Sequence, residues 1–443
     1  MDKQTILAML EAEQVRFVVL WFSDIMGVVK SVIVPVERIN EVLDRGVRFD
    51  GSSLEGFARV AESDMILTPD LDSFVILPWD SDEDRSARLI CRVQTPTGEP
   101  FIGDPRNALI KILNKAEDMG YSLKIGTELE FYLFRAEANQ SLFPLRTYDD
   151  ASYFDISNDF GQGIRRRIIT TLQQLGYRVD SAHHEIGAGQ HEIDFDYDDA
   201  LKIADLILTS RVAMRTVAQR HGLHCTFMPR PLENAPGSGM HTHQSLHDVK
   251  TGYNIFSDPT HQYGLSETAE QFLAGQLYHA KAMCAVLAPL VNSYKRLSTS
   301  FEAPKFITWA HLNRDGAAMI RVPYTTPGME QHARLELRCP DPSANPYLAL
   351  AVMLAAGLDG IRHKMTLPPP TEETLLKKTR NRNLQELPSS LGEALDELSH
   401  DDVILDALGP FISDRFLAAK RQELDEYNGY VTQWELNRYI TRY

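Results

Sequence analysis

The chain has 443 residues, of which 43% are hydrophobic and 24% charged, and it carries a formal net charge of -16 at pH 7. This length is too great for one ordinary hydrophobic core and predicts a globular protein of about two or three domains. The negative charge repels phosphate backbones and anionic lipid, so we expect neither a nucleic-acid partner nor a membrane partner. The four cysteines lack CxxC spacing and the N-terminus does not read as a signal peptide, which makes a reducing, cytoplasmic location the expected one.

The N-terminal part is rich in predicted strands. The segments FVVLWFSD and VVKSVIVPV flank a turn at Met26 and Gly27 and predict a hairpin, which is followed by a short helix ending near Gly46. Turn residues cluster in TPTGEPFIGDP, where Asp104 and Pro105 give the signal for the start of a helix. We therefore predict a small α+β domain over residues 1–100 and a large C-terminal domain over residues 101–443.

In the C-terminal domain, predicted strands alternate with long helices. The strands are SLKIGTELEFYLF, HEIDFDY and ARLELRC, and the longest helices cover residues 199–221 and 346–361. This order predicts an α+β fold, with a large antiparallel sheet flanked by helices.

Charged residues alternate with apolar ones along these strands. In GTELEFYLF, Glu128 and Glu130 point to one face of the strand, while Leu129 and Phe131 point to the other. Alone, this pattern is typical of the solvated face of an antiparallel sheet.

Three further segments place polar side chains in the same manner. They are HHEIGAGQHEIDF with Glu185 and Glu192, GSGMHTHQSL with His241, His243 and Ser245, and ARLELRCPDP with Arg334, Glu336 and Arg338. Several strands with this pattern favour one shared funnel over several unrelated solvated faces. Its carboxylates and imidazole suit Mg²⁺ or Mn²⁺, and its arginines suit a nucleotide and an acidic substrate. Phosphoryl transfer is the reaction that this combination serves.

Many segments, in order along nearly the whole chain, resemble the glutamine synthetase family. They are RFDGSSLEGF, ESDMILTPDL, GTELEFYLF, HHEIGAGQHEIDF, GSGMHTHQSL, NSYKRL, FEAP, NRD, IRVP and RLELRCPDPSANPYLALAVMLAAGLDGI. The chain has neither a GxxxxGK phosphate loop nor a GxGxxG turn, so ATP is expected in the funnel. The resemblance implies the bacterial and archaeal type I, with a β-grasp-like N-terminal domain.

The resemblance also implies a role for each matching residue. The metal near the acceptor carboxylate would be bound by Glu130, Glu185 and Glu192, and the metal on the ATP phosphates by Glu128, His241 and Glu336. The nucleotide side would include His243, Ser245, Arg314 and Arg334. Glutamate would meet Gly237, Arg296 and Arg338, and ammonium would meet Asp50 with Ser53 and Tyr153 nearby. The catalytic residues implied are Asp50, the flap acid Glu302 and, on the ATP side, Arg321.

The implied reaction is the ATP-dependent ligation of glutamate and ammonia to glutamine through a γ-glutamyl phosphate, with two or three Mg²⁺ or Mn²⁺ ions per site. Because Asp50 lies in the N-terminal domain, the resemblance implies active sites between adjacent subunits of a dodecamer of two hexameric rings. The C-terminal segment YVTQWELNRYITRY would clasp the opposite ring. Gln385 stands where one branch carries its nucleotidylated tyrosine, and Arg59 resembles the feedback-sensing arginine of the other branch.

Two departures from the family pattern lie at the glutamate and amine end of the site. Pro236 stands before Gly237 where Asn is usual, and residues 298–301 replace the usual Val-Pro-Gly-Tyr of the flap. One alternative is therefore a glutamate–amine ligase that uses an alkylamine or polyamine, although the ammonium set around Asp50 favours ammonia. A non-catalytic assembly or regulatory homologue is another alternative; it predicts the loss of a metal ligand, and none is lost.

Overall fold

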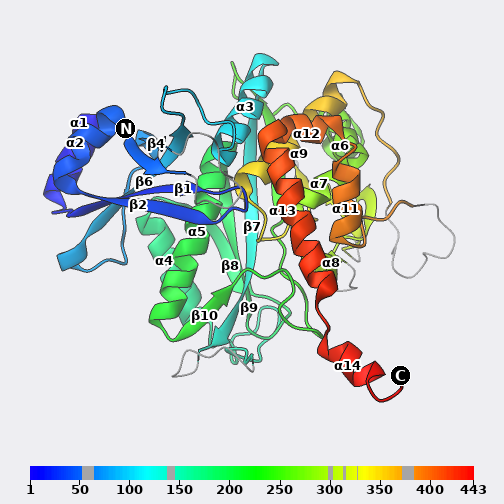
Figure 1. The fold of residues 1–443 in the computed structure, drawn as a ribbon. Coiled ribbons are helices and arrows are strands. Elements are labelled where there is room, and N and C mark those ends of the chain that lie inside the picture. The colour runs from blue at the N-terminus through cyan, green and yellow to red at the C-terminus, as the bar shows by residue number, and fades with distance from the viewer. Residues whose placement is uncertain (52–63, 137–144, 298–302, 313–315, 327, 372–383) are drawn as a thin grey trace.

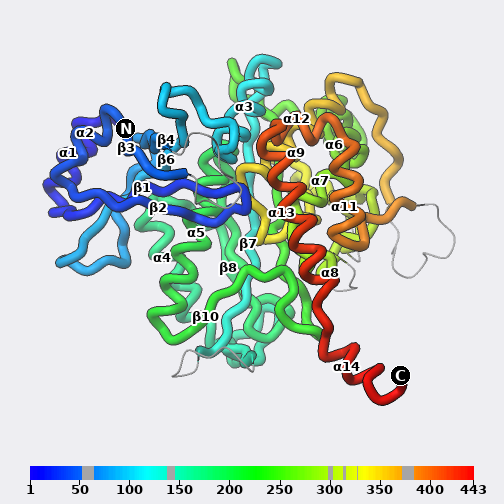
Figure 2. The backbone as a smooth tube through the Cα atoms, viewed as in Figure 1, coloured from blue at the N-terminus to red at the C-terminus, as the bar shows by residue number. Residues whose placement is uncertain are grey.

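The computed structural model describes residues 1–51, 64–136, 145–297, 303–312, 316–326, 328–371 and 384–443 (Figure 1). The described elements form two lobes, a smaller one at the N-terminal end and a larger one built around a second sheet (Figures 1 and 2). None of the helices in these ranges is both long and apolar enough to cross a bilayer. All four cysteines are buried free thiols.

The N-terminal lobe contains a six-stranded sheet in which β2, β1, β6, β4 and β3 follow one another and β5 pairs with β6. Its strands are β1 (Phe17–Ser23), β2 (Val29–Pro35), β3 (Val47–Asp50), β4 (Asp64–Pro69), β5 (Val75–Ile76) and β6 (Ser86–Gln94). The predicted hairpin is confirmed, because β1 and β2 pair in antiparallel fashion. Two helices, α1 (Lys3–Ala12) and α2 (Ile39–Arg45), contribute apolar side chains to the core of this lobe. All six strands precede residue 100, but the exact domain boundary stays a prediction.

The larger lobe is built on an eight-stranded sheet with the order β12-β13-β14-β11-β7-β9-β8, and β10 pairs with β7. Its strands are β7 (Tyr121–Arg135), β8 (Val179–His184), β9 (Gln190–Asp199), β10 (Leu223–Thr226), β11 (Thr242–Asp248), β12 (Phe306–Ala310), β13 (Ala318–Arg321) and β14 (Leu335–Leu337). The sheet is antiparallel, as predicted, except at its edge, where β12 and β13 are parallel. A parallel pair needs a returning connection in place of a tight hairpin.

Helices cover this sheet and form most of the C-terminal part of the chain. They are α3 (Pro105–Asp118), α4 (Gln162–Gln174), α5 (Ala200–Arg220), α6 (Glu267–Tyr278), α7 (Ala280–Leu287), α8 (Ser293–Leu297), α9 (Pro346–Arg362), α11 (Leu391–Leu398), α12 (Asp402–Leu408), α13 (Pro410–Gly429) and α14 (Gln433–Tyr439). As predicted, Asp104 caps α3 by accepting a hydrogen bond from the Arg106 amide. Helix α9 is apolar on nearly all sides because it packs against α3, α5, α6, α7 and α12. Helix α14 projects from the body of the chain (Figure 1).

Helices α6 and α9 are in close main-chain contact where Gly275 meets Gly360. A Cβ atom added to Gly360 would lie 2.1 Å from the carbonyl oxygen of Gln271 and 2.7 Å from the amide nitrogen of Gly275. Both contacts are to main chain, which cannot rotate away as a flexible side chain can. The absence of a side chain at Gly360 is therefore what permits this packing.

We expect Gly360→Ala to lower the thermal unfolding midpoint, because its methyl group would collide with the backbone of α6. Overpacking of this kind costs about 1–3 kcal/mol. Gly163→Ala in α4 is the matched control, since a Cβ there meets nothing within 4 Å. That substitution should stabilise the protein by about 0.5–1 kcal/mol, because alanine favours a helix over glycine. Equal midpoints in the two variants would contradict the close-contact interpretation.

Candidate active site

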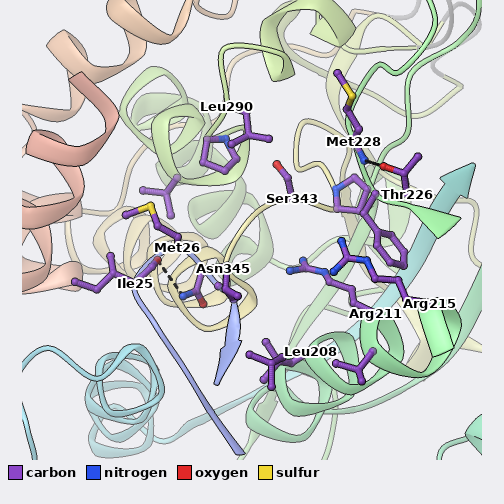
Figure 3. A pocket seen from close by; sticks show the side chains of 18 of the residues that line it. Ile25, Met26, Leu208, Arg211, Arg215, Thr226, Met228, Leu290, Ser343 and Asn345 are labelled. Atoms are coloured by element: carbon purple, nitrogen blue, oxygen red, sulfur yellow. Dashed lines mark hydrogen bonds between the residues drawn. The ribbon is translucent and has the colours of Figure 1, made fainter. Parts of the chain in front are cut away.

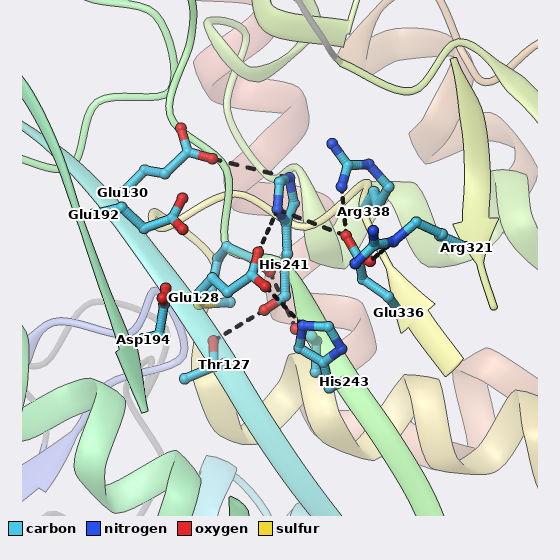
Figure 4. Close-up of polar contacts among 12 residues, drawn as sticks. Thr127, Glu128, Glu130, Glu192, Asp194, His241, His243, Arg321, Glu336 and Arg338 are labelled. Atoms are coloured by element: carbon cyan, nitrogen blue, oxygen red, sulfur yellow. Dashed lines mark hydrogen bonds and ion pairs between the residues drawn. The ribbon is translucent and has the colours of Figure 1, made fainter. Parts of the chain in front are cut away.

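Most of the polar residues that alternate along the predicted strands lie on or directly beside four adjacent strands of the large sheet, β14, β11, β7 and β9, and Glu185 directly follows β8. Register brings them face to face, with His243 opposite Glu336 and Glu130 opposite Glu192. Between the polar positions of β7, Leu129 and Phe131 are completely buried in the core on the other face. The period-two alternation therefore separates a hydrophobic face from a face of ionisable side chains (Figure 4).

Glu128 is the centre of a first group. Its Oε2 accepts a hydrogen bond from His241 Nδ1 at 2.8 Å, and its Oε1 accepts one from His243 Nε2 at 2.7 Å. Burial alone would raise the pKa of Glu128, but the hydrogen bonds and charges of the two imidazoles outweigh it and hold the pKa well below its usual range. Arg334 Nε donates to His243 Nδ1 at 3.3 Å, which assigns the proton of a neutral His243 to Nε2.

Glu336 belongs to the same group and is completely buried. Arg321 pairs with one of its carboxylate oxygens and Arg338 with the other (Figure 4). Burial acts to raise the pKa of Glu336, yet Arg338, the two histidines and Arg321 together lower it to about 2. Glu336 is therefore a carboxylate throughout the neutral pH range, held in place by two guanidinium groups.

A second group lies at the β8–β9 hairpin and consists of His183, Glu185 and Glu192. The Nε2 atom of His183 is 3.2 Å from Glu192 Oε1, and its Nδ1 atom is 3.6 Å from Glu185 Oε1. Glu130 lies between the two groups, since its Oε2 accepts a hydrogen bond from Gln190 Nε2 at 2.8 Å and its Oε1 is 3.9 Å from His241 Nε2. Burial, together with the surrounding carboxylates, raises the pKa of Glu192 well above its usual range.

Either group could hold a divalent cation. One ligand atom from each of Glu128, His241 and Glu336 lies within 4.8 Å of the others, and the same holds for His183, Glu185 and Glu192. Carboxylate oxygens with one imidazole form a donor set that suits Mg²⁺ or Mn²⁺. The raised pKa of Glu192 also supports a cation site here, because a bound cation would offset the repulsion between neighbouring carboxylates. The residues present therefore fit the ions that the sequence predicts.

A third cluster, Asp149, His184 and His191, also has ligand atoms within 4.8 Å of one another, but its hydrogen bonds indicate a structural role. Arg165 donates to His191 Nδ1 at 2.7 Å, and a guanidinium at this distance repels a cation. His184 is hydrogen-bonded to Asp149 through Nε2 and to the carbonyl oxygen of Glu185 through Nδ1. The cluster thus fixes the main chain that carries Glu185.

A glycine-containing loop lies beside the two groups and packs against Arg296. A Cβ atom at Gly237 would lie 2.7 Å from Arg296 Cγ, and one at Gly239 would lie 2.6 Å from Arg296 Nη2. Arg296 is buried and donates hydrogen bonds to the carbonyl oxygens of Cys339, Pro340 and Arg338. The structure therefore brings Gly237, Arg296 and Arg338 together next to the carboxylates.

The remaining predicted site residues lie farther out. The ring of Tyr153 is 5.3 Å from that of His183, and Ser245 Oγ is hydrogen-bonded to His247 at 3.1 Å. Asp50 ends β3 at the edge of the N-terminal sheet, and this strand lies in the other lobe from β7 and β8 (Figure 2). One chain therefore does not bring Asp50 into the cluster. The predictions for Ser53, Arg59, residues 298–301, Glu302 and Arg314 lie outside the described residues.

Sequence reasoning did not assign His183, Gln190 or Asp194. His183 completes the second group, Gln190 donates to Glu130, and Asp194 lies opposite Glu128. The predicted β8–β9 hairpin could have identified His183, because counting residue pairs outward from its glycine turn places His183 opposite Glu192. Gln190 and Asp194 also share the strand face of Glu192 at a spacing of two residues.

Comparison with known proteins shows which family the chain belongs to. The family model described as the glutamine synthetase catalytic domain matches residues 102–439, and the model of the glutamine synthetase β-grasp domain matches residues 14–96. The chain belongs to the glutamine synthetase family. It is an α+β enzyme in which a β-grasp domain precedes the catalytic domain.

Relatives that carry the glutamine synthetase name match the entire chain. It is 48% identical to the glutamine synthetase of Thermus thermophilus and 45% identical to that of Halobacterium salinarum, and it covers 99% and 97% of those proteins, respectively. Two solved structures of GmaS, one without ligand and one in a complex with ADP, superpose with TM-scores of 0.88 and 0.89. Each shares 32% sequence identity with this chain, and the match covers 98% of this chain and 99% of GmaS.

The crowding of carboxylates predicts a pH-dependent stability in protein treated with a chelator. The folded state raises the pKa of Glu192 above its ordinary value of 4.5, so the folded state binds this proton more tightly than the unfolded chain does. Stability is therefore greatest below pH 4.5 with respect to this group and falls as the pH rises through the raised pKa. We expect Glu192→Gln to reduce this loss in thermal unfolding scans at increasing pH.

The same variant should also respond less to metal. Adding Mg²⁺ should raise the unfolding midpoint of the wild type, because an ion that binds the folded state alone stabilises it. Glu192→Gln should gain less, since it lacks one ligand charge. Glu117→Gln, at an exposed position of α3, is the control and should behave as the wild type in both scans. An unchanged pH dependence and an unchanged Mg²⁺ response in Glu192→Gln would contradict this account of the second group.

Proposed function

We propose that the protein ligates glutamate and ammonia to form glutamine: the glutamate side-chain carboxylate takes the terminal phosphoryl group of ATP, which releases ADP, and ammonia then displaces phosphate from the γ-glutamyl phosphate intermediate. The observation that supports this most is the meeting of two carboxylate–histidine groups with Arg321, Arg334 and Arg338 on one face of the large sheet. Family membership supports this reaction type, and the side chains present are of the kinds that the reaction needs.

On the nucleotide side, we assign Glu128, His241 and Glu336 to the ion that binds the ATP phosphates. We assign Glu130, Glu185 and Glu192 to the ion near the glutamate side chain, where His183 is an additional donor. Two or three bound Mg²⁺ or Mn²⁺ ions would neutralise the charge of the phosphoryl group and orient it. Arg321 then offsets charge on the same group, and the proposed nucleotide contacts are His243, Ser245, Arg314 and Arg334.

Glutamate is proposed to lie against Arg296, Arg338 and the loop at Gly237. Arginine suits this role because its planar fork pairs with a carboxylate through two hydrogen bonds. Arg296 is already fixed by three main-chain carbonyl groups, which pre-orders it for the substrate. Its close contact with Gly237 means that a side chain at this loop position would displace it.

Ammonium is proposed to bind at Asp50 of an adjacent subunit, with Ser53 and Tyr153. The carboxylate of Asp50 accepts a proton from ammonium, and the resulting ammonia attacks the carbonyl carbon of the γ-glutamyl phosphate. The carbon–nitrogen bond forms, the carbon–oxygen bond to phosphate breaks, and the departing phosphate takes up the proton that the nitrogen loses when the amide forms. Glu302 is proposed to close the site, so that water does not compete with ammonia for the acyl phosphate.

A larger amine is the second candidate for the acceptor. Pro236, at one of the departures from the family pattern, directly precedes Gly237, and its carbonyl oxygen accepts a hydrogen bond from Tyr132 at 2.7 Å. This departure therefore changes a loop that touches Arg296. The higher identity to chains named glutamine synthetase, 48% against 32% for GmaS, favours ammonia.

The deciding measurement is phosphate release from ATP with glutamate and Mg²⁺, comparing ammonium with methylamine, ethylamine and putrescine. We expect ammonium to give the highest kcat/KM. Asp50→Ala should lower it by about 10²–10⁴-fold, the usual contribution of a proton-transfer group. Asp44→Ala, at an exposed position of the same lobe, should retain wild-type turnover. Turnover with an amine but not with ammonium would contradict the proposal and support the second candidate.

We also propose that the active sites form between subunits of a dodecamer built from two hexameric rings. Strand β3, which ends at Asp50, lies in the other lobe from β7 and β8, and this separation supports a shared site (Figure 2). Helix α14 and its flanks support an inter-ring contact, because they expose large apolar side chains, namely Tyr430, Val431, Trp434, Tyr439 and Ile440. A cytoplasmic location stays a prediction.

Mixing two inactive variants tests the shared site. Asp50→Ala and Glu336→Gln should each abolish turnover when assembled alone. After dissociation and joint reassembly in equal amounts, some sites combine an intact Asp50 with an intact Glu336 from the neighbouring subunit, so activity should return to about one quarter of the wild type. Mixing without dissociation is the control and should restore nothing. Failure of co-assembled oligomers to regain activity would show that each site is built from one chain.

A further inference from the structure

A separate cavity of about 550 Å³ lies between the two lobes (Figure 3). Its walls come from the turn of the N-terminal hairpin at residues 25–29, from one side of α5, from the end of β10 and from the segment at Ser343. Asn345 ties these walls together, because its side-chain amide donates to the carbonyl oxygens of Asp24 and Ile25 at 3.1 and 3.2 Å. The cavity is thus part of the junction between the lobes.

The charged residues that line this cavity are all basic. Arg211, Arg215 and Lys420 line it, whereas none of the lining residues in the described part of the chain is an aspartate or a glutamate. This concentration of positive charge occurs in a chain whose formal net charge is -16. Figure 3 shows Arg211 and Arg215 projecting from α5 into the same space, with Ser343 across from them.

Two of these cations are buried: Arg211, with 7% of its surface exposed, and Lys420, which pairs with Glu423. The Nη2 atom of Arg211 donates to the carbonyl oxygen of Ala344 at 2.7 Å, while its Nε has no hydrogen-bond partner among the described residues. Burial and the neighbouring Arg215 lower the pKa of Arg211 to about 9. A buried guanidinium with one carbonyl partner is costly, and an anion beside it would offset that cost.

The remainder of the lining is largely apolar and includes Leu208, Val286 and Phe416. Arg215 lies over the ring of Phe227, 5.2 Å from its centroid, so even this exposed cation borders an apolar wall. We propose that this cavity binds a small organic anion, with a carboxylate or phosphate at Arg211 and Arg215 and an apolar body against Leu208, Val286 and Phe416.

This position links the anion to the active site without making it a substrate site. Arg211 Nη2 lies 4.0 Å from the sulfur of Met240, the residue before His241. An anion at Arg211 therefore acts on a side chain adjacent to a proposed metal ligand, and it also touches the hairpin turn of the other lobe. A metabolite bound in this cavity would therefore alter the contacts that join the two lobes.

Binding can be tested on the assembled full-length protein, with ADP and Mg²⁺ present at saturating concentration to occupy the catalytic site. The probes are hexanoate, hexan-1-ol and inorganic phosphate, followed by calorimetry and thermal unfolding. Hexanoate should bind and raise the unfolding midpoint, whereas hexan-1-ol at the same concentration should not. Arg211→Met should weaken hexanoate binding about tenfold or more, the effect of losing one charge-assisted contact. Binding of inorganic phosphate that Arg211→Met also weakens would support phosphate as the anionic group.

Two further variants make the result decisive. Without any probe, Arg211→Met should unfold at or above the wild-type temperature, because it removes a guanidinium charge that is costly to bury. Should this variant fail to fold, Arg215→Met changes an exposed side chain and should also weaken hexanoate binding. Arg167→Met, at an exposed position of α4, is the control and should bind as the wild type. Wild-type protein that binds neither hexanoate nor phosphate, or binding that none of the cavity variants weakens, would overturn the proposal.

Discussion

Repulsion among buried carboxylates is the constraint around which the large lobe is organised. Glu130 and Glu192 are buried and Glu128 is half-buried on the adjacent strands β7 and β9, and an uncompensated charge buried here would cost several kcal/mol. The sheet tolerates them because its other face is a continuous hydrophobic core, in which Leu129, Phe131 and Ile193 are completely buried. The free energy of burying the apolar face thus holds together a polar face that would not assemble by itself.

The two donor groups are compensated in different ways. In the first group, Glu336 is paired with Arg321 and Arg338, and Glu128 accepts hydrogen bonds from two histidines. In the second group, His183 Nε2 lies 3.2 Å from Glu192, and burial together with the neighbouring carboxylates raises the pKa of Glu192. The first group is therefore neutralised largely by side chains, while the second gains more from a bound cation.

Much of this arrangement could be predicted from sequence, because period-two alternation is a local property. It identified Glu128 and Glu130, the strand face of His241 and His243, and the hairpin that carries Glu185 and Glu192. The roles of His183, Gln190 and Asp194 depend on partners on the neighbouring strand, and the alternation along one strand shows the face of a residue but not its cross-strand partner. The parallel pairing of β12 with β13 and the close contact between Gly275 and Gly360 also depend on tertiary packing, which no local pattern encodes.

The ion pairs of the first group also constrain how substrates can enter. Arg321 and Arg338 are the side chains proposed to meet the phosphoryl group and glutamate, yet in this structure both pair with Glu336. A substrate carboxylate or phosphate must therefore share or take over these guanidinium groups, and Glu336 then needs another partner, the role proposed for the ion on the ATP side. Because breaking one half of a buried pair leaves a costly charge, entry of the anionic substrate and of the cation should be favourable only together. The charge balance around Glu336 therefore couples the binding of the anionic substrate to the binding of the cation.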